Sequence, residues 1–189
     1  MLDRIDEIFI LHWKLQQKID KDSESILNDL SNLDFFKAVS MRNHRSRGVD
    51  IQKRVIQKNG WTPVSRTEEK GDAKRGEDFI EIKSSIITPL KDSSITLRGI
   101  RGWEEINFYC FLIIDYTYFE SDKITNYIFW LSKEEFENES KRYGIAKKYN
   151  LSDKASKENR NIPLGINMKI GDKNFIRWMG KYANKDIKV

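Results

Sequence analysis

Two acidic residues and a lysine near the middle of the chain have the types and spacing for metal-assisted chemistry on phosphate esters. Asp72 is followed by Glu81 and then Lys83, both inside the run Asp78-Phe79-Ile80-Glu81-Ile82-Lys83. Carboxylate oxygens are the ligands that Mg²⁺ prefers, and bound Mg²⁺ polarises phosphoryl oxygens and helps to deprotonate water. A neighbouring ammonium stabilises charge on the phosphate or orients the attacking water. Asp72 and Glu81 are therefore candidate metal ligands and Lys83 a candidate catalytic residue, with Glu69 as a supporting or second-metal carboxylate.

The elements that must position these residues are a strand and a turn. Apolar and polar residues alternate from Asp78 to Lys83, which predicts a half-buried strand with Glu81 and Lys83 on one face. Gly76, just before this strand, can adopt a positive φ in a turn.

The register of the resulting hairpin decides where the first carboxylate lies. If the turn closes on a two-residue Arg75-Gly76 loop, Asp72 pairs opposite Phe79. Asp72 then lies diagonal to Glu81, within the roughly 7–8 Å reach of diagonal cross-strand neighbours.

A solvated strand face is the alternative interpretation. One-third of the residues are charged, and the same acid-x-Lys spacing recurs at Glu68/Lys70, Asp72/Lys74, Glu139/Lys141 and Asp186/Lys188. The Glu81/Lys83 pair differs from these in its apolar strand, the glycine turn before it and the aspartate upstream.

The spacing Asp72-x8-Glu81-x-Lys83 resembles the PD-(D/E)xK nuclease signature, with Gly71 in place of the proline. The closer resemblance is to PvuII-like type II restriction endonucleases, in which a helix ending in glycine and a strand precede E-x-x-D-A, a glycine-bearing turn and E-x-K-S. The residues on that pattern are Glu69, Asp72, Ala73, Glu81, Lys83 and Ser84. The run Asn159-Arg160-Asn161-Ile162-Pro163-Leu164 resembles the segment with which such enzymes read bases.

This resemblance, which spans roughly residues 48–170, implies an α/β fold of the restriction-endonuclease type: a mixed β-sheet flanked by helices, with an N-terminal helical segment. It implies one nuclease domain over 1–189, in which 1–35 would be helical and dimerise, 48–131 would form the catalytic core and 147–170 would recognise DNA. It also implies Mg²⁺ bound by Asp72, Glu81 and Ile82, and a homodimer that cuts double-stranded DNA. A cognate DNA methyltransferase would exist in the host without being a bound subunit.

Basic and amide side chains are candidates for DNA contacts. Arginine forks suit phosphates, and Arg and Asn make bidentate contacts with guanine and adenine. The stretch from Ser93 to Trp103 corresponds to the part of PvuII-like enzymes that enters the major groove. The candidates are Arg47, Ser94, Thr96, Arg98, Arg101, Asn159, Arg160 and Asn161. Solvated surface loops are the alternative for these stretches.

Hydrophobic spacing and capping residues predict the other elements. The expected helices cover 2–20, 23–33 and 49–59, with another that begins after Ser132. The expected strands cover 61–64, 107–118 and 126–131. The basic segment 41–48 and the polar segment 152–161 are expected loops, the stretches 162–170 and 174–179 close the fold, and 180–189 is expected to be a frayed surface end.

The composition agrees with a cytoplasmic protein that has a polyanionic partner. Lys and Arg number 34 against 29 acidic residues, a net charge of +5, which is a modest basic bias. A single cysteine, Cys110, excludes an internal disulfide, and one cysteine with two histidines argues against structural zinc. The apolar run 108–114 is far shorter than the ~20 residues needed to cross a bilayer, and no signal-peptide pattern is present.

These observations support one leading hypothesis and two alternatives. The leading hypothesis is a Mg²⁺-dependent, homodimeric, sequence-specific DNA endonuclease. The first alternative is a repair or junction-resolving nuclease of the same superfamily, which would prefer branched or mismatched DNA. The second is a non-catalytic basic DNA-binding module, which would bind DNA without Mg²⁺-dependent cleavage.

Overall fold

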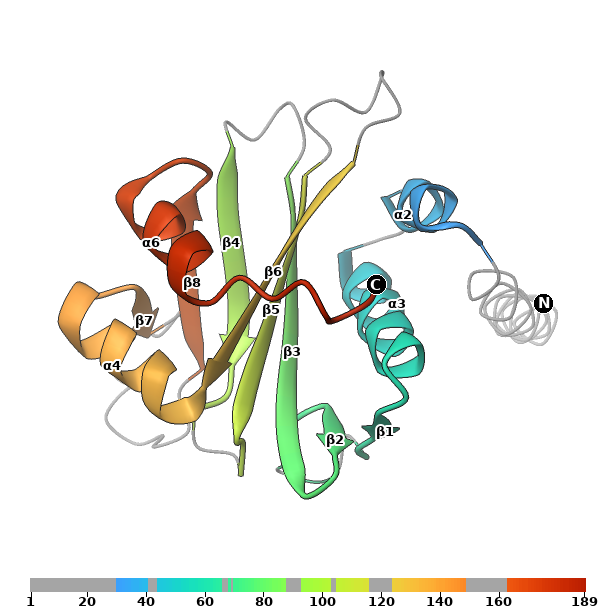
Figure 1. Cartoon of the computed structure of the whole chain (residues 1–189), viewed down its shortest axis with the longest axis horizontal. Coiled ribbons are helices and arrows are strands. Elements are labelled where there is room, and N and C mark those ends of the chain that lie inside the picture. Colours follow the sequence, from blue (N-terminus) through green and yellow to red (C-terminus); the bar gives the residue numbers. More distant parts are fainter. Residues whose placement is uncertain are drawn as a thin grey trace, which may run out of the picture. The chain divides into compact units, whose positions relative to one another are not determined.

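The computed structural model describes residues 30–40, 44–65, 68, 70–87, 93–102, 105–115, 124–148 and 163–189 (Figure 1). The chain divides into two compact units, Met1–Asp50 and Ile51–Val189. The predicted helix 2–20, most of the predicted helix 23–33 and the predicted loop 152–161 lie outside the described residues. Within the described part, no helix is long and apolar enough to cross a membrane.

The first two described helices begin at positions that differ from the prediction. Helix α2 covers Asn32–Ser40, and the Ser31 hydroxyl accepts a hydrogen bond from the Asp34 N–H at 3.2 Å. A helix that runs from 23 through 33 is therefore wrong, because Ser31 caps a new helix. Helix α3 covers His44–Lys58, so the second half of the predicted loop 41–48 is helical. Gly60, at φ 63°, follows α3 as expected for a helix end.

A five-stranded sheet carries the residues singled out above. Its order is β1-β2-β3-β5-β6, with β3 and β5 parallel and the other neighbouring pairs antiparallel. This confirms a mixed sheet in an α/β fold. The strands are β1 (Thr62–Pro63), β2 (Ala73–Arg75), β3 (Asp78–Ile87), β5 (Phe108–Asp115) and β6 (Thr125–Ser132).

A second, three-stranded antiparallel sheet has the order β4-β8-β7. It consists of β4 (Ser94–Ile100), β8 (Leu164–Lys169) and β7 (Ala146–Lys148). Side chains of both sheets share one hydrophobic core with those of α4 (Lys133–Tyr143) and α6 (Lys173–Lys181). In Figure 1 these two helices lie on the same side of the five-stranded sheet as β7 and β8.

Strand β5 is the most buried element, as its unbroken apolar sequence predicts. Its residues from Tyr109 to Ile114 are at most 1 % exposed, because β3 and β6 pair along its two edges and side chains cover both faces. Cys110 lies within it, and burial raises the pKa of its thiol to about 12. This thiol is therefore a neutral core group and no nucleophile.

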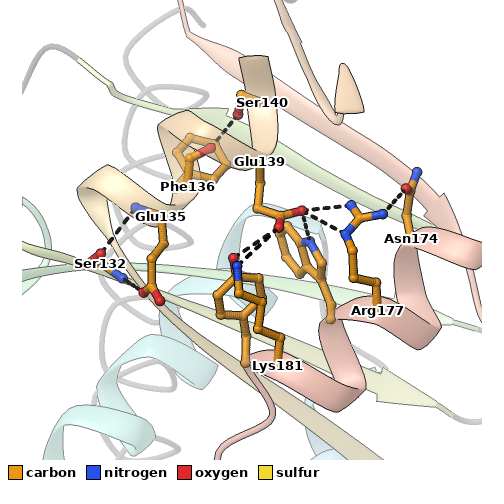
Figure 2. A network of polar contacts seen from close by, with 10 residues as sticks. Ser132, Glu135, Phe136, Glu139, Ser140, Asn174, Arg177 and Lys181 are labelled. Atoms are coloured by element: carbon orange, nitrogen blue, oxygen red, sulfur yellow. Dashed lines mark hydrogen bonds and ion pairs between the residues drawn. The ribbon is translucent and has the colours of Figure 1, made fainter. Parts of the chain in front are cut away.

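A buried carboxylate joins α4 to α6 (Figure 2). Glu139 accepts hydrogen bonds from the Arg177 guanidinium at 2.7 Å, the Trp178 indole at 3.1 Å and the Tyr182 hydroxyl at 3.0 Å. Burial alone would raise the pKa of Glu139, but these hydrogen bonds and the Arg177 charge lower it below the ordinary value. Helix α4 begins at the predicted cap Ser132, which forms a capping box with Glu135.

The prediction of a frayed C-terminal end is wrong. Tyr182, Ile187 and Val189 are buried. The Trp130 N–H donates to the Tyr182 carbonyl at 2.9 Å, and the Lys188 N–H donates to Asn59 Oδ1 at 2.9 Å. The segment therefore pairs with β6 at one bridge, between Phe129 and Ala183, and its apolar side chains are buried, which the polar composition of 180–189 does not reveal (Figure 1).

Candidate active site

The turn between β2 and β3 lies one residue later than the sequence predicts. Arg75 pairs with Asp78, so the two-residue loop begins at Gly76 and not at Arg75. Gly76 has φ 61°, and the favoured two-residue hairpin turns require a positive φ at their first residue. The predicted pairing of Asp72 with Phe79 is therefore wrong, because a shift of one residue in the loop moves every pair of the hairpin.

Asp72 lies beside Ile80 and is held by the backbone of β3. Its N–H donates to the Ile80 carbonyl at 2.8 Å, and its Oδ2 accepts a hydrogen bond from the Ile82 N–H at 2.8 Å. The preceding Gly71 has φ 76°, and a Cβ there would lie 2.8 Å from the Ile80 carbonyl oxygen. Proline, which the nuclease signature has at this position, requires φ near −65° and could not adopt this backbone.

The structure brings the predicted carboxylates and the lysine together. The Lys83 ammonium lies 2.5 Å from Glu81 Oε1 and 3.3 Å from Asp72 Oδ2. Glu81 and Lys83 are two residues apart on β3 and so project from the same face of the strand. The hairpin supplies Asp72 to that face from the other side of the turn.

A fourth charged side chain completes the cluster. Arg101, just after β4, places Nη2 3.4 Å from Asp72 Oδ1 and 3.2 Å from Glu81 Oε2. The sequence interpretation has Arg101 as a DNA contact and gives no sign that it meets the carboxylates. We refer to Asp72, Glu81, Lys83 and Arg101 as the charged cluster.

The Glu81 carboxylate is the deepest part of the charged cluster. Its side chain is 0 % exposed, against 12 % for Asp72. The prediction of a half-buried strand is thus wrong at Glu81, because β3 is paired along both edges and other side chains cover its polar face. Burial raises the pKa of Glu81; the Lys83 charge lowers it and the Asp72 charge raises it, and burial dominates.

The oxygen atoms of the charged cluster suit a hard divalent cation such as Mg²⁺. Among the described residues, no three His, Cys, Asp or Glu side chains gather in one place. Mg²⁺ is usually held by one or two carboxylates together with waters and substrate phosphate, and Asp72 and Glu81 supply that number. Ile82 can contribute only its carbonyl, which faces the same edge of β3 as the N–H bonded to Asp72.

Three predicted DNA-contact residues lie on one face of β4. Ser94, Thr96 and Arg98 alternate with the buried Ile95 and Leu97, and of the three Arg98 is the most exposed. The Thr96 N–H donates to Ser85 Oγ of β3 at 3.1 Å. Strand β4 is therefore joined to β3, the strand that carries Glu81 and Lys83.

An irregularity in β4 directs Arg101 toward the carboxylates. The pairing of β4 with β8 shifts between Leu97 and Ile100, and Gly99 has φ 70°. Regular alternation would place Ile100 on the face of Thr96, but Ile100 is buried in the core. The extra residue of the bulge restores Ile100 to the core and re-aims Arg101. A glycine inside a strand pattern is the sequence signal for such a bulge.

The remaining predicted site residues belong to the other compact unit or are not described. Arg47 lies in α3, within the Met1–Asp50 unit. Glu69 and the base-reading candidates Asn159, Arg160 and Asn161 lie outside the described residues.

Comparison with known proteins finds no relative: no protein-family model matches the chain, and no curated protein is significantly similar to it. The charged cluster and the local motif are therefore the features from which a function can be inferred.

Proposed function

We propose that the chain is a Mg²⁺-dependent DNA endonuclease, a type II restriction enzyme of the PD-(D/E)xK kind. The observation that carries this proposal is the meeting of Asp72, Glu81 and Lys83 at the β2–β3 hairpin. The Lys83 ammonium lies within 3.3 Å of both carboxylates, on a chain with a net charge of +5. That set of groups suits hydrolysis of an anionic phosphodiester.

In this proposal each group of the site has a separate role. Asp72, Glu81 and the Ile82 carbonyl would hold Mg²⁺, which when bound polarises the phosphate and lowers the pKa of water. The Lys83 ammonium orients the attacking water and stabilises the negative charge that builds on the phosphate oxygens. The water oxygen bonds to phosphorus, one P–O ester bond breaks, and the leaving oxygen takes up a proton.

Sequence-specific cutting of both strands requires more than one such site. A two-fold homodimer matches the symmetry of a palindromic DNA site, and we propose that residues 1–35 build it. We propose Ser94, Thr96, Arg98 and the 159–161 segment for DNA contacts, with Arg47 on phosphate. A methyltransferase of the same specificity would protect host DNA.

One observation favours the non-catalytic DNA-binding module instead. Lys83 and Arg101 already neutralise the two carboxylates, as a purely structural ion-pair network would. A repair or junction-resolving nuclease would share the same chemistry. It would differ in its preference for branched DNA.

The deciding experiment is digestion of plasmid DNA with and without Mg²⁺ by the wild type and by Asp72→Asn and Lys83→Ala. Asparagine keeps an acceptor for the Ile82 N–H, so Asp72→Asn should fold. The matched controls are Asp186→Asn and Lys188→Ala, which alter an exposed acid-x-Lys pair elsewhere in the chain.

We expect discrete Mg²⁺-dependent fragments from the wild type and from both controls. Each site variant should lose about 100-fold or more in cleavage rate while it still binds DNA. Binding to many DNA sequences without cleavage would establish the binding module. Preferential cutting of branched or mismatched substrates would establish the repair nuclease. Equal cleavage by Lys83→Ala and the wild type would refute the assigned site.

A further inference from the structure

Every carboxylate oxygen of the charged cluster contacts a basic side chain, so a metal ion must compete with at least one of these cations. Asp72 Oδ2 and Glu81 Oε1 face the Lys83 ammonium at 3.3 and 2.5 Å. Asp72 Oδ1 and Glu81 Oε2 face Arg101 Nη2 at 3.4 and 3.2 Å. All four oxygens thus contact a cationic nitrogen, and two negative charges meet two positive ones.

Arg101 is the basic side chain placed to move. Its contacts with the carboxylates are longer than the Lys83–Glu81 contact, and its side chain is 29 % exposed against 19 % for Lys83. Lys83 shares β3 with Glu81, whereas Arg101 follows the bulge at the end of β4. An arginine on this more exposed side has an alternative partner in DNA, because its planar fork binds phosphate bidentately.

We propose that Arg101 occupies the metal-binding side of Asp72 and Glu81 in the DNA-free protein and moves to a DNA phosphate when substrate binds. This inference rests on the proposed function and adds its regulation: DNA binding opens the carboxylates to the divalent cation. The reciprocal effect follows from linkage. If bound DNA raises the affinity for the divalent cation by some factor, the bound cation raises the affinity for DNA by the same factor. The DNA-free protein then holds divalent cations weakly and hydrolyses no phosphate ester in the absence of DNA.

The test measures Mn²⁺ binding to the DNA-free, full-length protein by the electron paramagnetic resonance signal of free Mn²⁺. Arg101→Gln removes the competing charge, and Arg142→Gln, on the exposed surface of α4, is the matched control for the loss of one positive charge. We expect Arg101→Gln to bind Mn²⁺ about tenfold more tightly than the wild type or more, and Arg142→Gln to match the wild type. An affinity of Arg101→Gln equal to or weaker than that of the wild type would overturn the proposal.

Two further variants keep this result interpretable. Asp72→Asn combined with Arg101→Gln should lose the gain, whereas a gain that persists would place Mn²⁺ elsewhere and overturn the proposal. Arg101→Lys keeps the charge but replaces the fork by one ammonium, so its affinity for Mn²⁺ should lie between those of the wild type and Arg101→Gln. The Arg101→Lys measurement tests the proposal even if Arg101→Gln does not fold. If Arg101→Lys binds Mn²⁺ no more tightly than the wild type does, the proposal is overturned.

The phosphate contact is tested separately, in EDTA, by the salt dependence of binding to a pool of random-sequence duplexes. Loss of one phosphate contact in Arg101→Gln should lower the slope of log K against log salt by about one, and an unchanged slope would refute that contact. These readouts are independent of cleavage. If the wild type cuts DNA but Arg101→Gln gains no Mn²⁺ affinity, the competition is wrong and the nuclease stands. If Arg101→Gln binds Mn²⁺ more tightly than the wild type but the wild type cuts no DNA, the nuclease assignment fails.

Discussion

The Ile82 N–H donates a hydrogen bond to Asp72 Oδ2 at 2.8 Å, so the main chain of β3 holds the carboxylate that comes from the other side of the hairpin. The Asp72 N–H donates in turn to the Ile80 carbonyl at 2.8 Å. Asp72 is therefore positioned by two backbone contacts that do not involve its charged neighbours. The geometry of the site then depends on the hairpin, and above all on the residue before Asp72.

Alanine at Gly71 should disrupt this position. Its Cβ would lie 2.8 Å from the Ile80 carbonyl oxygen at φ 76°, whereas a Cβ at Gly76, at φ 61°, would meet nothing within 4 Å. We expect Gly76→Ala to cost about 1–2 kcal/mol and Gly71→Ala about 2–5 kcal/mol in urea unfolding. Gly71→Ala should also lose Mg²⁺-dependent cleavage. Equal stability of the two variants would show that the close approach at Gly71 is absent.

Glu139→Gln should destabilise the protein in a pH-dependent way. Burial would raise the pKa of Glu139, but the hydrogen bonds from Arg177, Trp178 and Tyr182 lower it overall. A carboxyl with a lowered folded-state pKa stabilises the protein above its unfolded pKa, about 4.3, and loses that contribution as pH falls through the folded value.

We therefore expect Glu139→Gln to cost about 2–4 kcal/mol at neutral pH, measured by urea unfolding. The difference from the wild type should shrink as the pH falls below about 4. Glu137→Gln, two residues away on the exposed face of α4, is the matched control. It should leave stability nearly unchanged, because the ion pair of Glu137 with Lys141 is solvent-exposed. A cost for Glu139→Gln that stays constant down to acidic pH would contradict the lowered pKa.

The C-terminal segment should contribute measurably to stability. Ile187 is buried, whereas the Lys188 side chain is exposed and only its backbone bonds to Asn59. Ile187→Ala should cost about 2–4 kcal/mol of unfolding free energy, and Lys188→Ala should cost little because it keeps the backbone bonds. Thermal unfolding of the two variants side by side checks this. A neutral Ile187→Ala would restore the prediction of a frayed end.

Arg98→Ala should weaken DNA binding through the loss of one positive charge on the β4 face. In metal-free buffer the slope of log K against log salt should fall by about one, uniformly across DNA sequences if Arg98 contacts phosphate. Lys185→Ala, exposed in the C-terminal segment, is the control for charge alone. A weakening confined to some sequences would assign Arg98 to base recognition, and no change at all would exclude this face of β4 from the DNA contact.

The sequence by itself determined the features that depend on neighbouring residues. Apolar and polar residues alternate from Asp78 to Lys83, which placed Glu81 and Lys83 on one face of a strand. Successive side chains of a strand point to opposite faces, so this placement follows from the backbone alone. An unbroken apolar run predicted the buried β5, and Ser132 predicted the start of α4.

Only the tertiary structure decided which distant groups reach the carboxylates. The turn began at Gly76, which has positive φ, so Phe79 pairs with Lys74 and not with Asp72, and the Asp72 N–H bonds to the Ile80 carbonyl. The bulge in β4 positioned Arg101 beside Asp72 and Glu81. The C-terminal segment packs its apolar side chains into the protein although its composition is polar. These outcomes depend on contacts between residues far apart in the chain, and the free energy of such contacts comes from packing that local sequence patterns do not encode.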